Sequence, residues 1–164
     1  MLKIKIIELI EDLRAGGKPS REALETAADR LCRWKAASGI HGLWEKPPVM
    51  VTATLDDAMG HGLSLIHRFA EAAGLRIHPL GLEQPADAVI AACRDVKPAF
   101  LGLTVLQFDS EGDLEDIGRN LPEVTRVVAG GPVFAADPDL AERTGIHHVA
   151  RDAAVFWQIL LQYA

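Results

Sequence analysis

From residue 49 onward, short apolar runs alternate with amphipathic patterns along the chain. Five runs are short enough for strands and lie at 49–54, 75–80, 99–106, 126–129 and 146–149. The intervening and final segments place apolar residues three or four positions apart, which predicts helices over 63–73, 85–96, 112–120, 138–144 and 152–163. Regular alternation of strands and helices is typical of a parallel sheet with helices on both faces.

The first 48 residues follow a different pattern. Residues 2–14 have apolar positions at helical spacing, and a second helix is predicted from Ser20 to about Gly39. Residues 39–48 contain two glycines and two prolines, so this stretch cannot continue a helix. We therefore expect a helical arm and connector over 1–48, followed by an α/β domain over 49–164.

Right-handed crossovers between five parallel strands favour a doubly wound, flavodoxin-like sheet with the strand order 2-1-3-4-5. In that order the winding reverses between the first and third strands, and ligands bind where it reverses. The loops after Thr54 and Leu106 should therefore meet in a ligand crevice, and the loop after Ala129 should border it.

Composition narrows the function classes. The chain has 164 residues and a formal net charge of -6, and it has no basic cluster, so we expect no nucleic-acid partner. No apolar run is as long as a membrane span, and charges interrupt the amino-terminal segment, so we expect no membrane partner and a cytoplasmic location. Cys32 and Cys93 lack neighbours at metal-ligand spacing and are interpreted as buried, reduced thiols.

The loop after the first strand carries two adjacent carboxylates, Asp56 and Asp57. They would repel the phosphate of a flavin mononucleotide, which disfavours flavin binding. Paired aspartates also occur in phosphate-accepting receiver domains, with Thr104 as a possible hydroxyl here. Such a domain further needs an aspartate at the end of its third strand and a lysine after its last. Asp109 is displaced into the following loop, and residues 150–152 include no lysine, so the receiver interpretation is weaker than the next one.

Three motifs, in order along residues 49–164, together resemble a known family. Asp57-x-Met59-x-x-Gly62 resembles the Asp-x-His-x-x-Gly loop of the cobalamin-binding domains in methionine synthase, methylmalonyl-CoA mutase, glutamate mutase and corrinoid methyl carriers. Thr104-x-Leu106 is similar to that family's Ser-x-Leu segment, and Gly130-Gly131 is similar to its Gly-Gly. The resemblance implies a flavodoxin-like fold, with cobalamin as the cofactor.

The resemblance also assigns roles to residues. It implies that glycines let the nucleotide tail of cobalamin pass, and that the hydroxyl of Thr104 contacts the buried benzimidazole. The cofactor-binding residues that it implies are Asp57, Met59, His61, Gly62, Thr104, Leu106, Gly130 and Gly131. No residue is positioned for acid–base or nucleophilic chemistry, so any catalysis would belong to the cofactor or a partner.

Met59 departs from the family pattern, because the family has a cobalt-ligating histidine at that position. A thioether is a poorer ligand than imidazole for oxidised cobalt. Cobalamin could then keep its own benzimidazole, bind without a protein ligand below cobalt, or be absent. His61 could in principle replace the ligand, but a shift of two positions across a glycine turn favours an ordinary loop histidine.

The expected function is a corrinoid-binding module that carries the cofactor or presents it to a partner: a methyltransferase, a mutase or a radical enzyme. Alternatives are a cobalamin- or tetrapyrrole-responsive sensor and a degenerate domain that acts as an interaction module. Corrinoid methyl carriers cover the upper face of the cofactor with a longer helical bundle. Trp44 could approach that face here, but packing of the arm is favoured; the apolar face of residues 4–13 could also make a homo-oligomer.

Overall fold

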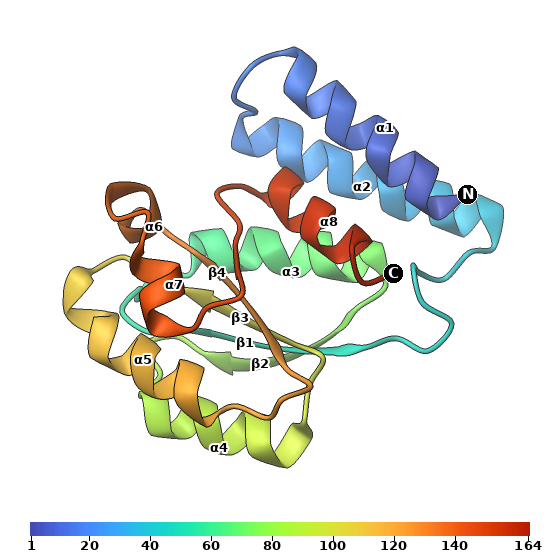
Figure 1. Ribbon diagram of the computed structural model, residues 1–164. Helices are drawn as coiled ribbons and strands as arrows, with labels where there is room; N and C mark the ends of the chain where they lie inside the picture. Colours follow the sequence, from blue (N-terminus) through green and yellow to red (C-terminus); the bar gives the residue numbers. More distant parts are fainter.

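The computed structural model describes all residues, 1–164, and contains one five-stranded parallel sheet (Figure 1). Its strands are β1 (Val49–Thr54), β2 (Arg76–Gly81), β3 (Phe100–Thr104), β4 (Arg126–Gly130) and β5 (His148–Val149). The order is β2-β1-β3-β4-β5, and every pairing is parallel. This confirms the predicted fold class and order.

Helices cover both faces of the sheet. The elements between and after the strands are α3 (His61–Ala73), α4 (Ala86–Val96), η1 (Phe108–Ser110), α5 (Glu111–Asn120), α6 (Val133–Ala136), α7 (Leu140–Thr144) and α8 (Ala153–Leu161). Successive strand residues point to opposite faces, so Met50 joins the core beneath α3 and α8, and Val51 joins the core beneath α4 and α5. The central strands β1, β3 and β4 are buried on both sides, as their continuous apolar runs require, whereas the edge strand β2 is partly exposed.

The arm consists of α1 (Leu2–Ala15) and α2 (Arg21–Ser38), which form a further layer outside α3 and α8 (Figure 1). Ser20 caps α2 by accepting a hydrogen bond from the Ala23 amide, and Gly39 ends the helix in the left-handed conformation. Both predicted ends of this helix are confirmed.

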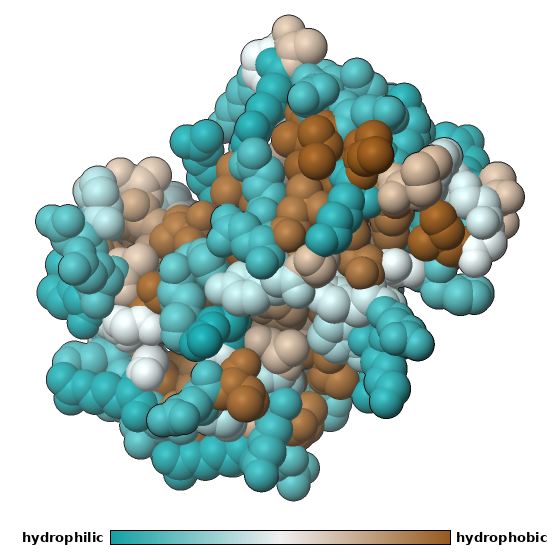
Figure 2. All heavy atoms as spheres, turned by 45° about the vertical axis from the view of Figure 1, so that its right-hand side comes forward, coloured by the Kyte–Doolittle hydropathy of each residue, from teal (hydrophilic) through white to brown (hydrophobic).

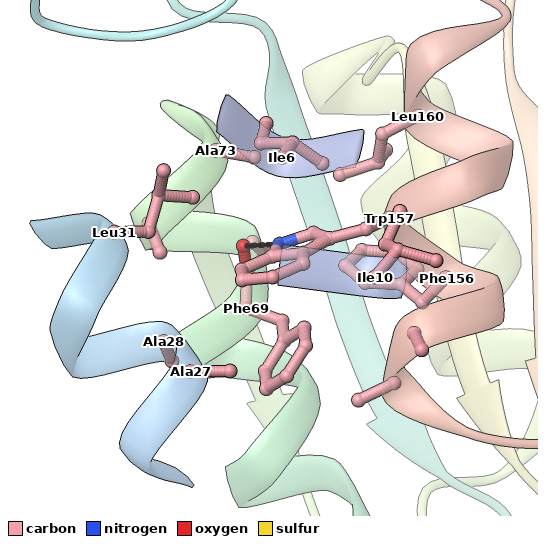
Figure 3. Close-up of a cluster of buried hydrophobic side chains, with 14 of the residues drawn as sticks. Ile6, Ile10, Ala27, Ala28, Leu31, Phe69, Ala73, Phe156, Trp157 and Leu160 are labelled. Carbon is pink, nitrogen blue, oxygen red and sulfur yellow. Dashed lines mark hydrogen bonds between the residues drawn. The ribbon is translucent and has the colours of Figure 1, made fainter. Parts of the chain in front are cut away.

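The arm shares one apolar core with the α/β domain. Trp157 of α8 is fully buried at the centre of this core, and its indole N–H donates to the carbonyl of Phe69 at 2.9 Å (Figure 3). Ile6, Ile10 and Leu31 bring the arm into the same cluster. Because these side chains are covered within the chain, most of the apolar face expected to support a homo-oligomer is already used. Ile4 and Ile7 remain exposed on α1, where apolar residues reach the surface of the arm (Figure 2).

The connector after α2 crosses the amino-terminal edge of the sheet. Trp44 donates from its indole to the carbonyl of Tyr163 at 3.0 Å and lies beside Phe100, the first residue of β3. This edge is opposite the one where the ligand crevice forms. Trp44 therefore packs the connector onto the domain, as the favoured interpretation had it.

Two expectations need correction. Cys32 is exposed on α2, whereas Cys93 is buried and its burial raises the pKa of the thiol to about 11. The strand predicted over 146–149 is reduced to two residues. His147 explains part of this difference, because its Nδ1 accepts from the Val127 amide at 2.9 Å, in place of a backbone partner.

Candidate functional site: the carboxyl edge of the sheet

The loop over residues 57–62, called the ligand loop below, is a closed turn between β1 and α3. The Oδ1 atom of Asp57 accepts from the amides of Met59 at 2.8 Å and Gly60 at 3.2 Å. The hydroxyl of Thr54 donates to the Asp57 carbonyl at 2.6 Å. Gly60 has a φ of 70°, which suits glycine and lets the chain turn directly into α3. Asp57 thus orders its own loop and is only 7% exposed.

Asp56 joins this loop to the one after β3. Its Oδ1 accepts from the amide of Leu106 at 2.6 Å, and its Oδ2 accepts from the Gln107 amide and the Ser110 hydroxyl, both at 2.8 Å. Three donors on one carboxylate make a strong, charge-assisted clamp. Asp56 therefore fixes two neighbouring loops of the crevice in one arrangement.

The Gly130-Gly131 pair closes the third side of the crevice. The amide of Val105 donates to the Gly130 carbonyl at 2.9 Å. Gly131 has a φ of 125°, and a Cβ atom at this position would lie 1.9 Å from the carbonyl oxygen of Val105. No side chain fits there, so Gly131 is required by the close approach of two loop backbones.

These loops enclose a pocket of about 340 Å³ at the carboxyl edge. Six of the eight residues expected to bind a cofactor line it: Asp57, Gly62, Thr104, Leu106, Gly130 and Gly131. Met59 and His61 do not. The pocket has a second set of walls that sequence reasoning missed. Lys18, Pro19 and Leu24 come from the arm, and Arg151 and Asp152 come from the segment between β5 and α8.

A model of the B12-binding domain matches residues 48–155, about two thirds of the chain. The chain belongs to the B12-binding domain family. Cobalamin is therefore the cofactor of this domain, as the three motifs implied. No protein with a curated description matches the chain in sequence.

Solved structures agree with the fold of this B12-binding domain. A cobalamin-binding protein from Desulfitobacterium hafniense superposes with a TM-score of 0.78 at 19% identity, over 94% of this chain and 76% of its own. The monomethylamine corrinoid protein of Methanosarcina barkeri gives 0.67 at 19% identity, over 87% of this chain and 66% of its own. A chain of the methanol:cobalamin methyltransferase complex from the same organism gives a TM-score of 0.68 at 19% identity, over 97% of this chain and 64% of its own. The present chain thus spans between about two thirds and three quarters of these proteins.

Below the pocket, a narrow extension called the tail slot runs between the sheet and α3 and α8. It shares Ile66, Thr104, Gly130 and Ala150 with the pocket. Its free volume is about 30 Å³, which leaves room for only one or two water molecules. A Cβ at Gly102 would lie 2.4 Å from the Cε of Met50, so the end of the Met50 side chain fills the space that this glycine leaves open.

The residues of the B12-binding domain fit a cobalamin tail in two respects. Gly62 has nothing within 4 Å of where a Cβ would be, so open space lies above the start of α3. In the slot behind it, the nearest neighbour of Gly102 is the flexible thioether of Met50 rather than backbone, and such a side chain can change rotamer. The glycines and Thr104 would hold the tail, and a benzimidazole would enter only as Met50 moves aside.

Met59 lies on the rim of the crevice with 70% of its surface exposed. Leu82, Leu106 and Phe108, on the loops after β2 and β3, are also exposed, by 41%, 39% and 53%. The loop after β2 is held to the ligand loop, since the Thr54 hydroxyl accepts from the Glu83 amide at 2.8 Å. The carboxyl edge therefore carries an apolar rim on three connected loops, of which the sequence motifs had indicated only Met59 and Leu106.

No histidine takes the place of the missing ligand inside the pocket. His61 is exposed and forms the first residue of α3, where its carbonyl accepts from the Arg21 guanidinium at 2.9 Å. His67 shares a hydrogen bond with the Thr52 hydroxyl at 2.7 Å, and its burial lowers the pKa of the imidazole. His147 and His148 are held by Val127 and Tyr163, and burial lowers the pKa of both.

Asp56 and Asp57 accept hydrogen bonds from four loop amides, which are therefore not free to hold a flavin phosphate. No group of three or more His, Cys, Asp or Glu side chains in the structure could hold a metal ion. None of the helices is both long and apolar enough to cross a membrane.

Proposed function

We propose that this chain is a corrinoid carrier that presents cobalamin to a separate methyltransferase, without a histidine of the ligand loop on cobalt. The observation that carries the proposal is the convergence of Thr104, Gly130, Gly131 and Gly62 on one pocket, while the position of the usual ligand holds an exposed methionine. Bound cobalamin would supply a cobalt centre that accepts and donates a methyl group.

The chain's own residues would hold and orient the cofactor. The tail slot would take the nucleotide tail, and the apolar rim around Met59 would support the lower face of the corrin ring. Asp57 directs its Oδ1 to two amides of its own loop, and position 59 offers it a methionine in place of a histidine to orient. The lower face of cobalt would then meet the cofactor's own benzimidazole or no ligand.

A methyltransferase is the favoured partner because of two structures of similar fold. One is the monomethylamine corrinoid protein, and the other is a chain of the methanol:cobalamin methyltransferase complex. No residue of the pocket is positioned to perform the transfer itself. The partner would therefore supply the substrate site and complete the upper face.

A regulatory sensor is the second candidate, and one observation favours it. Three residues of the arm, Lys18, Pro19 and Leu24, line the cofactor pocket, so a bound ligand would contact the arm directly. A sensor would change its oligomeric state or its response to light on binding cobalamin, and would not support methyl transfer.

The test is to mix purified protein with hydroxocobalamin or methylcobalamin, desalt it, and record the visible spectrum of the protein fraction. Retained colour is the expected result, with no contribution from a protein imidazole. A colourless protein fraction with both forms would contradict the proposal and support the interaction module. Size-exclusion chromatography of the loaded protein separates carrier from sensor, since the carrier keeps its oligomeric state.

A further inference from the structure

The cofactor pocket borders a second recess along a wall that carries two positive charges. This outer recess has a volume of about 810 Å³ and shares Lys18, Gly131 and Arg151 with the cofactor pocket. Lys18 lies in the short loop between α1 and α2, and Arg151 lies between β5 and α8. Two segments more than 130 residues apart in sequence thus bring cations to the same wall.

Neither cation is neutralised by the chain. Lys18 and Arg151 take part in none of its ion pairs. They are the only charged residues that line the outer recess. On a chain with a net charge of -6, two unpaired cations on one wall point to an anionic ligand.

The acidic side chains of the cofactor pocket, Asp57 and Asp152, do not form ion pairs with these cations. Asp57 directs its Oδ1 to the amides of Met59 and Gly60, and Asp152 directs its Oδ1 to the Val155 amide as the cap of α8. Both carboxylates are therefore held by backbone donors, which leaves the ammonium of Lys18 and the guanidinium of Arg151 free.

We propose that Lys18 and Arg151 bind the phosphodiester of the cobalamin nucleotide tail as it passes Gly131. This assignment rests on the proposed function and deepens it. The phosphodiester is the anionic group of the tail, and Gly131, which lines both cavities, adjoins Gly130, which lines the pocket and the slot. The arm is then part of the cofactor site, because Lys18 lies between its two helices.

The test compares cobalamin with cobinamide, which lacks the nucleotide and its phosphodiester. Dissociation constants for both are measured by equilibrium dialysis on the full chain and on the double variant Lys18→Gln, Arg151→Gln. The expected result is a loss of cobalamin affinity of roughly tenfold or more, with cobinamide affinity changed by less than about twofold. The matched control is the variant Arg33→Gln, Lys46→Gln, since it also removes two positive charges, and both residues are exposed and lie outside both cavities.

A competition experiment separates the tail from free phosphate. Inorganic phosphate at millimolar concentration should weaken cobalamin binding to the wild type, and should not weaken cobinamide binding or binding to the double variant. An equal loss for both corrinoids in the double variant, or no loss for either, would overturn the phosphodiester site and leave the carrier function standing. If the wild type binds neither corrinoid, the proposed function and this site fail together.

Discussion

The tail slot and the ligand loop lie side by side at the carboxyl edge but depart from their family pattern to different extents. At the tail slot and the adjoining pocket wall, Gly130 and Gly131 remain, and threonine keeps the hydroxyl at position 104. In the ligand loop, the aspartate and the glycine remain, but Met59 stands in the ligand position with 70% of its surface exposed. The contrast predicts that retention of the cofactor tail and ligation of cobalt from below can be separated in this fold.

The largest effect should come from Gly131→Ala in the wall of the pocket. The new Cβ would lie 1.9 Å from the Val105 carbonyl oxygen, and the φ of 125° adds backbone strain. We expect the free energy of unfolding to fall by about 3 kcal/mol or more, with loss of cobalamin retention. Urea unfolding and desalting measure the two effects.

Gly16→Ala is the control for that variant, because nothing lies within 4 Å of its Cβ and its φ is negative. It should retain both stability and cobalamin. Equal stability of the two variants would contradict the close contact between the loops after β3 and β4.

The next largest effect should distinguish the two adjacent aspartates after β1, Asp56 and Asp57. Asp56 uses both carboxylate oxygens, so Asp56→Asn would turn an amide NH₂ toward a backbone N–H and cost about 1–3 kcal/mol. Asp57 uses only Oδ1, which asparagine can supply, so Asp57→Asn should cost less. Chemical unfolding of both variants checks the order, and a larger loss for Asp57→Asn would overturn it.

Gly62→Ala should separate stability from binding. Position 62 is in the first turn of α3 with open space around it, so alanine should raise the free energy of unfolding by about 0.5–1 kcal/mol. The same methyl group would enter the pocket and weaken cobalamin binding. Thermal unfolding and equilibrium dialysis measure the two changes; unchanged binding would place the tail elsewhere.

The smallest effect concerns pH. Burial lowers the pKa of His67, which bonds Thr52 behind the tail slot, below its ordinary value. The unfolded chain then binds more protons near that pKa, so the free energy of unfolding should fall as pH drops below about 6.5. His67→Gln should flatten this pH dependence, measured as the melting temperature at each pH. An unchanged slope would assign the pH dependence to His147 and His148.

The sheet and most of its helices follow from local patterns. The order 2-1-3-4-5 was predictable because short apolar runs and intervening helices leave few right-handed arrangements. The pocket residues on β3 and β4 were predictable because a parallel sheet brings the carboxyl ends of its strands together.

Other features depend on contacts that no local pattern encodes. Helical capping could account for one of the two aspartates, but the bonds from Asp56 to Leu106 and Gln107 cross about 50 residues of sequence. Periodicity predicted α1 and α2 but not how they dock, so Lys18 was not recognised as a pocket residue. The steric need for glycine at 131 likewise depends on the position of Val105.

The most direct test of the central claim is an electron paramagnetic resonance spectrum of cob(II)alamin bound to uniformly ¹⁵N-labelled protein. An axial nitrogen splits the cobalt lines with a multiplicity that depends on its isotope. The predicted spectrum shows either the ¹⁴N splitting of the cofactor's own base or no nitrogen splitting, and Met59→His introduces the ¹⁵N pattern. A ¹⁵N splitting in the wild-type protein would prove a ligand from the protein and contradict the account.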